Sequence, residues 1–199
     1  MRTTTQRKTA TRQRIIDAAG LLFREHGVDG TGVDAVMRLA GLTHGGFYLH
    51  FASKEALAAE VARSLLEQAA TRWDGLSRLP DHQAALKRIV ETYLNPAHAM
   101  SDAACPLTTL GPDVARRAES RDAMSGALRG MLDALARLVG RDQAAASLAT
   151  MVGAVVLARL ADDPTLAEAF LAAAAASVLA TDVNQTGTAC RPADDVLSE

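Results

Sequence analysis

Apolar side chains recur along most of the chain at the three- and four-residue spacing that places them on one face of a helix. Residues 11–26 and 120–139 show this spacing clearly, and Gly27 and Gly140 follow them as helix-ending residues. The other predicted helices span 54–76, 81–94, 141–160 and 164–181, with short turns of helix within 105–110 and 113–118. Because runs of β-branched residues are rare, the chain is predicted to be all-α.

Residues 31–55, TGVDAVMRLAGLTHGGFYLHFASKE, predict two short helices joined by a tight turn. The first spans Val33–Leu39, and the second spans His44–His50 with Thr43 as its cap. Gly41 lies in the turn, where glycine adopts backbone angles that other residues avoid. This arrangement is the helix-turn-helix pattern, whose second helix enters the major groove of DNA.

Charge is unevenly distributed along the sequence. The chain has a net charge of −2, yet residues 1–54 contain eight Lys/Arg against four Asp/Glu, which gives them +4 and leaves −6 for the rest. A basic head on an acidic body is typical of a phosphate-binding module joined to a regulatory body, although chance can produce the same imbalance. The predicted division is a flexible basic arm (1–10), a DNA-binding domain (11–54), a helical domain (55–182) and a disordered tail (183–199).

The last two predicted helices are more apolar than solvated helices usually are. Residues 143–158 contain no charged side chain, and residues 172–176 are all alanine. The uncharged run is shorter than the ~20 residues that span a bilayer, so we expect a buried helix and no membrane partner. A homodimer in which both helices pack against their copies would cover them. The core of a monomer is the alternative.

Several functional classes find no support in the residues. Cys105 and Cys190 lie far apart without metal-ligand spacing, and no secretory signal is visible, so we expect a reducing, cytoplasmic location. No nucleophile–base set, phosphate loop or acid pair stands in a recognisable context. We therefore expect no catalytic residue, no metal, no cofactor and no enzymatic activity.

The segments RQRIIDAAGLLFREHG and TGVDAVMRLAGLTHGGFYLHFASKEAL, within residues 11–57, resemble the N-terminal domain of the TetR/AcrR family of bacterial transcriptional regulators. The segment CPLTTLGPDVAR resembles a version found in a subset of that family. The resemblance implies a three-helix helix-turn-helix domain followed by a helical ligand-binding and dimerisation domain. It also implies a double-stranded, palindromic DNA operator and a small-molecule effector.

The implied function is a DNA-binding transcriptional regulator. Family precedent favours a repressor that a small molecule or a reactive electrophile releases from its operator. The alternative is an architectural DNA-binding protein without a sensor, which the large apolar body disfavours.

The helix-turn-helix segment supplies two sets of candidate DNA contacts. Hydroxyl, imidazole and cationic groups near helix starts suit phosphate oxygens. The predicted phosphate contacts are Thr31, Arg38, Thr43, Tyr48, His50 and Lys54. The predicted base or groove contacts are His44, Gly45, Gly46 and Leu49. Phe47 and Phe51 are predicted to be buried.

Three glycines depart from the family pattern. Gly45 and Gly46 stand where many members carry base-reading side chains, so we expect DNA shape and the N-terminal arm to supply much of the specificity. Gly32 stands where the family usually has Ser or Thr, and Thr31 is expected to substitute for the missing hydroxyl.

Candidate sensor residues are drawn from the helical body. They are Cys105, Trp73, Tyr93, Met124, Met131 and Met151. Methionines adapt to varied apolar ligands, although ordinary core packing is the alternative. Cys105 precedes a predicted short helix, where its thiol pKa would be lowered and its reactivity raised. A buried structural cysteine is the alternative there.

Overall fold

The computed structural model describes residues 4–101, 105–111 and 118–181, and these residues confirm the all-α prediction. The elements are α1 (Thr4–His26), α2 (Val33–Leu39), the 3-10 helix η1 (His44–Leu49), α3 (Lys54–Ser77), α4 (His82–Tyr93), α5 (Pro96–Ala99), α6 (Pro106–Thr109), α8 (Ala118–Val139), α9 (Arg141–Leu160) and α10 (Pro164–Leu179).

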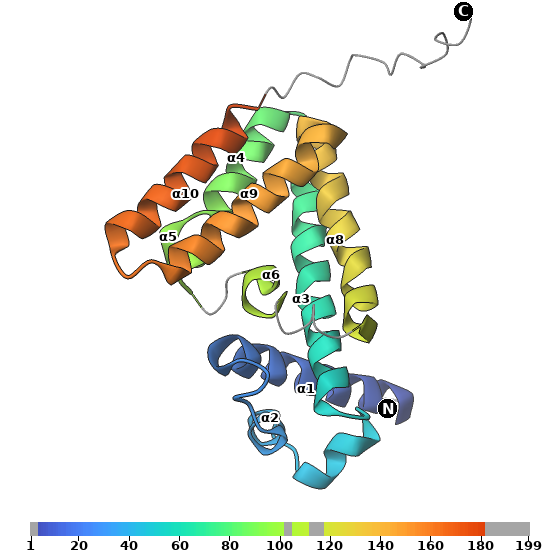
Figure 1. The fold of residues 1–199 in the computed structure, drawn as a ribbon. Coiled ribbons are helices and arrows are strands. Elements are labelled where there is room, and N and C mark those ends of the chain that lie inside the picture. The colour runs from blue at the N-terminus through green and yellow to red at the C-terminus, as the bar shows by residue number, and fades with distance from the viewer. Residues whose placement is uncertain (1–3, 102–104, 112–117, 182–199) are drawn as a thin grey trace, which may run out of the picture.

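Helix α3 joins a small N-terminal domain to a larger helical body (Figure 1). Helices α1 and α2 and the 3-10 helix η1 form the small domain, and α1 packs against the first part of α3. Farther along, α3 packs lengthwise against α8, while α9 and α10 form a pair that contacts α8 and α4 respectively. The helix-turn-helix segment therefore lies at the end of the molecule opposite α9 and α10 (Figure 1).

Side-chain caps and left-handed glycines set several helix ends. Ser53 Oγ accepts a hydrogen bond of 3.1 Å from a backbone N–H in the first turn of α3, and Asp163 accepts two at the start of α10. Both caps agree with the helix starts that the sequence predicts. Gly27 and Gly140 adopt φ values of 72° and 81°, as expected for residues that end or separate helices.

The predicted flexible arm is wrong for residues 4–10, which form the first two turns of α1. Residues 5–10 are exposed and mostly polar, and the segment contains no proline or glycine to stop the helix from extending. The short helix α5 is not predicted by the sequence; Asn95 caps it and Pro96 occupies its first position. The predicted helix at 113–118 lies outside the described residues, except for Ala118, which is the first residue of α8. The predicted tail at 183–199 also lies outside them.

The buried residues form one apolar core that runs through both domains. Leucine and alanine dominate it, and its few rings include Phe23, Phe47 and Trp73. Helix α9 is long and apolar enough to cross a membrane by length and composition, a test that core helices of folded proteins also pass. In this chain α9 packs between α8 and α10.

Candidate nucleic-acid interface and ligand cavity

The segment after Gly41 forms a short 3-10 helix rather than the predicted second helix of the motif. Gly41 adopts the left-handed φ of 68° that the sequence predicts for the turn. A Cβ there would lie 2.9 Å from Nη2 of Arg14, whose guanidinium donates a hydrogen bond to the Ala40 carbonyl at the end of α2. Two adjacent glycines, Gly45 and Gly46, lower the helix propensity of the segment, which accounts for the irregular geometry.

Two phenylalanines fix this 3-10 helix to the domain core. Phe47 and Phe51 are buried, as predicted, and their rings stack with centroids 5.8 Å apart. The Arg12 guanidinium lies 4.4 Å from the Phe51 ring centroid and also forms an ion pair with Glu60 of α3. The segment is thus anchored on its inner side, and its outer side remains accessible.

The outer side carries most of the predicted DNA contacts. Tyr48 is 65% exposed and Leu49 is 73% exposed, and Thr43 and Arg38 are exposed as well. Thr43 occupies the cap position of η1, but its side chain makes no capping hydrogen bond. Its hydroxyl is therefore available to a phosphate oxygen.

His44 is held by an acid from the preceding helix. Its Nδ1 pairs with a carboxylate oxygen of Asp34, near the start of α2, and both side chains are more than half exposed. This contact orients the imidazole and leaves Nε2 as its outward nitrogen. A negative charge beside His44 also makes the pair less attractive to phosphate than a lone cation would be.

Thr31 cannot serve as the predicted phosphate contact. It is 2% exposed, and its hydroxyl donates to the carbonyl oxygens of Gly27, at 2.8 Å, and Leu22, at 3.2 Å. The hydroxyl is turned inward because it satisfies carbonyls at the end of α1. Lys54 Nζ lies 3.3 Å from the Thr31 carbonyl oxygen, so this lysine ties the start of α3 to the same turn.

Neither glycine of the 3-10 helix is required by the protein's own packing. A Cβ at Gly45 would meet no atom within 4 Å, and one at Gly46 would lie 3.6 Å from the Met37 methyl group, an ordinary contact. Both residues have ordinary negative φ values. The fold therefore leaves room at positions 45 and 46 for side chains that the sequence does not supply.

His50 is only partly accessible. Its Nδ1 is buried without a hydrogen-bond partner in the described part of the chain. Burial lowers the pKa of His50, and the nearby cations Lys8 and Arg12 lower that pKa further. The imidazole is therefore neutral at pH 7, and it would contact phosphate as a hydrogen-bonding group rather than as a cation.

A cavity of about 340 Å³ lies where α1, α3, α4 and α6 meet. The rings of Trp73 and Tyr93 meet edge to face in its wall, with centroids 5.7 Å apart. The remaining lining residues include Arg24, Gln68, Arg72, Ile89, His98 and Cys105. Three of the predicted sensor residues, Trp73, Tyr93 and Cys105, thus line one cavity.

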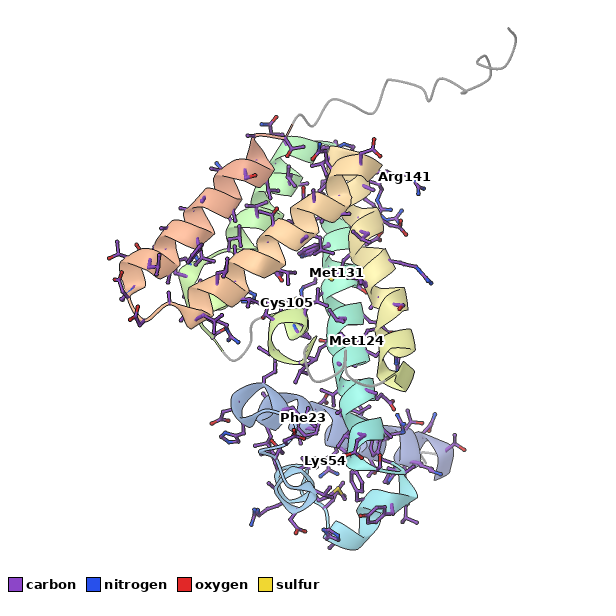
Figure 2. The ribbon with its side chains drawn as sticks, viewed as in Figure 1. Phe23, Lys54, Cys105, Met124, Met131 and Arg141 are labelled. Carbon is purple, nitrogen blue, oxygen red and sulfur yellow. The ribbon has the colours of Figure 1, made fainter. Side chains whose placement is uncertain are left out.

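The three predicted methionines do not line this cavity. Met124 and Met131 lie on α8 (Figure 2) and Met151 lies on α9, and all three are buried in the core. Met131 and Met151 are completely buried, which agrees with the alternative of ordinary packing. The i, i+3 and i+4 spacing of α8 predicts which residues are buried, but it does not predict whether a cavity lies beyond them.

The predicted low thiol pKa of Cys105 is wrong. Cys105 is 6% exposed, and burial raises its thiol pKa, although hydrogen bonds with Tyr93 and the Leu107 backbone and the charge of Arg72 partly offset that rise. The following helix, α6, has only a single turn and cannot outweigh the cost of a buried thiolate. At pH 7 the thiol is protonated and is a poor nucleophile.

Comparison with known proteins bears on both the candidate DNA-contact segment and the cavity. Residues 15–61 match the family model described as bacterial regulatory proteins, tetR family. This segment of the chain is similar to the N-terminal region of that family. The match covers the second half of α1, the helix-turn-helix segment and the start of α3, and it therefore contains every residue that we predict to contact phosphate or bases.

Two curated relatives are similar to this chain over short segments. The HTH-type transcriptional regulator AcrR of Shigella flexneri is 40% identical over 60 residues, 30% of this chain and 28% of that protein. The HTH-type transcriptional repressor KstR2 of Rhodococcus jostii (strain RHA1) is 32% identical over 89 residues, 44% of each. The chain thus spans less than half the length of these relatives.

The fold likeness extends farther than the sequence likeness. The crystal structure of Escherichia coli NemR in its reduced form superimposes with a TM-score of 0.72 at 21% identity, over 85% of this chain and 95% of that one. At that identity the likeness shows that the two proteins share the fold. The shared fold includes the helical body around the cavity as well as the N-terminal domain.

The sequence did not identify the polar part of this cavity. Arg24, Gln68, Arg72 and Thr92 line it, yet each lies among ordinary exposed positions of its helix. Arg24 comes from α1 of the DNA-binding domain, and only the packing of α1 against the body brings it to the cavity. The spacing of apolar residues predicts which face of each helix is buried, but it does not predict which other helix packs against that face.

Proposed function

We propose that this protein is a transcriptional repressor that binds operator DNA as a homodimer and dissociates when a small molecule occupies the cavity. The observation that carries the proposal is the exposed outer side of η1, where Thr43, Tyr48 and Leu49 project from a segment anchored by Phe47. It lies within the segment matched to a family of regulatory proteins, and the relatives are named as a regulator and a repressor.

Two copies of this segment would read a palindromic operator. A helix-turn-helix dimer binds half-sites about 34–36 Å apart, one turn of DNA. In the proposed complex Thr43, Tyr48, Arg38 and Lys54 contact phosphates, while Leu49 and His44 face the groove. Apolar contact between Leu49 and a thymine methyl group would supply direct readout, and the bare backbone at Gly45 and Gly46 permits close approach.

Exposed apolar residues on the last two helices support the proposed dimer. On α9, Val156, Leu157 and Leu160 are 38%, 45% and 76% exposed. On α10, Leu166 is 44% exposed, and Ala172, Ala173 and Ala176 are exposed as well. A four-helix interface between two copies would remove these side chains from water.

The cavity gives a route from ligand to DNA. Its wall includes Arg24 of α1 and residues between Leu65 and Trp73 of α3, the helix that enters both domains. A ligand that binds more tightly to a different orientation of α1 relative to α3 would change the separation of the two DNA-binding domains in the dimer. Its binding would then lower DNA affinity by linkage. A protonated, buried Cys105 favours this noncovalent route over reaction with an electrophile.

The proposal is tested by DNA selection and anisotropy. Duplexes selected from a random pool should be palindromic, and Thr43→Ala and Tyr48→Phe should each weaken binding to every selected sequence by about fivefold, the value of one hydrogen bond. Thr31→Val is the matched control, because its hydroxyl is internal: we expect a lower Tm without a change in DNA affinity. Unchanged affinity in both Thr43→Ala and Tyr48→Phe would contradict the proposed interface.

The architectural alternative makes a different prediction. A protein without a sensor would bind DNA equally well in the presence of any cavity ligand. Release of the selected operator by a compound that also changes Trp73 fluorescence excludes that alternative, because Trp73 is the only tryptophan and lines the cavity.

A further inference from the structure

The cavity has an apolar interior and a polar rim. Buried residues form the interior, among them Ala69, Trp73, Ile89 and Pro106. The rim is formed by side chains that are exposed or partly exposed: Arg24, Gln68, Arg72 and Thr92. A ligand that fits both regions has an apolar body and a polar end.

The rim carries two positive charges. Arg24 and Arg72 both line the cavity, and no carboxylate lines it in the described part of the chain. The charge of Arg72 acts within the cavity, because it lowers the pKa of His98 after the larger effect of burial and also lowers that of Cys105. His98 is consequently neutral at pH 7, so the two arginines are the cations of the lining.

The interior contains one buried hydroxyl that no oxygen or nitrogen of the described residues satisfies. Tyr93 is 5% exposed, and its hydroxyl makes no hydrogen bond of ordinary geometry there, with only the Cys105 thiol beside it. Buried hydroxyls almost always have a partner, so the arrangement points to one that binds from the cavity. Burial and the neighbouring Cys105 raise the pKa of Tyr93, which keeps the hydroxyl protonated and able to donate a hydrogen bond.

We propose that the cavity binds a small organic anion, a carboxylate with an apolar body. Arg24 and Arg72 bind the carboxylate, the body packs against Trp73, and the Tyr93 hydroxyl donates a hydrogen bond to an oxygen of the ligand. This inference rests on the proposed use of the cavity as the effector site. It adds the chemical class of the effector and names Arg24 as the contact that links the anion to the DNA-binding domain.

Matched probe pairs test the role of charge in binding. The probes are 4-phenylbutyrate and octanoate, each paired with its neutral alcohol, 4-phenylbutan-1-ol and octan-1-ol. Binding to the full-length protein is followed by the fluorescence of Trp73. We expect each carboxylate to bind about tenfold more tightly than its alcohol, because a charge-assisted hydrogen bond distinguishes the two. Equal affinities within both pairs, or no response to either carboxylate at millimolar concentration, would overturn the proposal.

Variants assign the preference to individual residues. Arg72→Gln and Arg24→Gln should each reduce carboxylate affinity toward that of the alcohols, whereas Arg88→Gln, an exposed position on α4 outside the cavity, should leave it unchanged. Tyr93→Phe should weaken carboxylate binding by about fivefold with little change in the Tm of the unliganded protein, because the hydroxyl has only the weakly hydrogen-bonding Cys105 thiol beside it there. If the Arg24→Gln and Arg72→Gln variants still bound each carboxylate about tenfold more tightly than its alcohol, the assignment would be overturned.

Operator release separates this inference from the proposed function. Carboxylates that bind by Trp73 fluorescence but leave the DNA complex intact would contradict the effector role and support the anion site. Release of the operator by the alcohols as readily as by the carboxylates would support the effector role and contradict the anion site.

Discussion

Position 32 illustrates how one side chain can be missing from an otherwise complete interface. Gly32 caps α2 with ordinary extended angles, φ −81° and ψ 148°, and no side-chain cap is present. A Cβ there would meet no atom within 4 Å. The Thr31 hydroxyl cannot substitute, because it bonds to carbonyls at the end of α1. The first helix of the motif therefore starts with neither a capping hydroxyl nor a phosphate-facing one.

Restoring that hydroxyl should improve both stability and DNA binding. Gly32→Ser should stabilise the fold by a few tenths of a kcal/mol through an N-cap hydrogen bond. It should also tighten DNA binding by about fivefold for every sequence, through one further phosphate contact. Thermal unfolding and anisotropy measure the two effects, and Gly32→Ala is the control without a hydroxyl. Equal DNA affinity in Gly32→Ser and Gly32→Ala would show that position 32 does not face phosphate.

The reactivity of Cys105 should depend on pH in the manner of a buried thiol. Because burial raises its pKa, the thiolate fraction at pH 7 is smaller than that of an ordinary cysteine, and it increases only above the usual thiol range. In a Cys190→Ser background, alkylation by iodoacetamide should be at least tenfold slower at pH 7 than for free cysteine. Alkylation at pH 7 as fast as that of free cysteine would indicate a reactive thiol and restore the electrophile-sensing route.

At the scale of the elements, the caps and periodic faces were predictable and the irregular segments were not. Ser53, Asp163 and Gly140 mark helix boundaries through local backbone chemistry, so the sequence is sufficient to place α3, α9 and the start of α10. The 3-10 geometry of η1 instead depends on competition between two glycines and the burial of Phe47. Residues 4–10 are helical because α1 extends toward the N-terminus beyond its amphipathic part. Composition alone does not distinguish such an extension from a flexible arm.

The cap of α10 gives a pH-dependent prediction at this scale. Backbone N–H groups of Thr165 and Leu166 hold the pKa of Asp163 below its usual value, with the bond to Thr165 the larger cause. A carboxyl whose folded-state pKa is depressed stabilises the fold above its unfolded pKa, and this contribution is lost as pH falls through the folded value. Asp163→Asn should therefore unfold with a weaker acid dependence than the original protein. Identical Tm-against-pH curves between pH 2 and 5 would contradict this assignment.

Across the whole molecule, the site divides into parts that the sequence contains and parts that only packing creates. The contacts of η1 lie within one continuous segment, so a motif was enough to locate them. The cavity combines residues from α1, α3, α4, α5 and α6, and three of its lining residues were predicted on residue type alone. Its two arginines became apparent only when α1 was seen to pack against the helical body, because no local pattern relates position 24 to position 72.

The dimer is the whole-molecule feature on which the proposed regulation depends, and its interface can be tested at one position. Val156 on α9 is 38% exposed and is not one of the buried core residues, so Val156→Glu should leave the protomer folded. A charge buried between two copies would, however, oppose association strongly. We expect the variant to be monomeric in light scattering. It should also lose about a hundredfold in operator affinity, because a monomer contacts one half-site only and binding there no longer favours binding at the second. Gln83→Glu adds the same charge at an exposed position on α4 and should change neither property. A Val156→Glu protein that remains dimeric would place the interface elsewhere and remove the proposed link between half-site spacing and the α9–α10 pair.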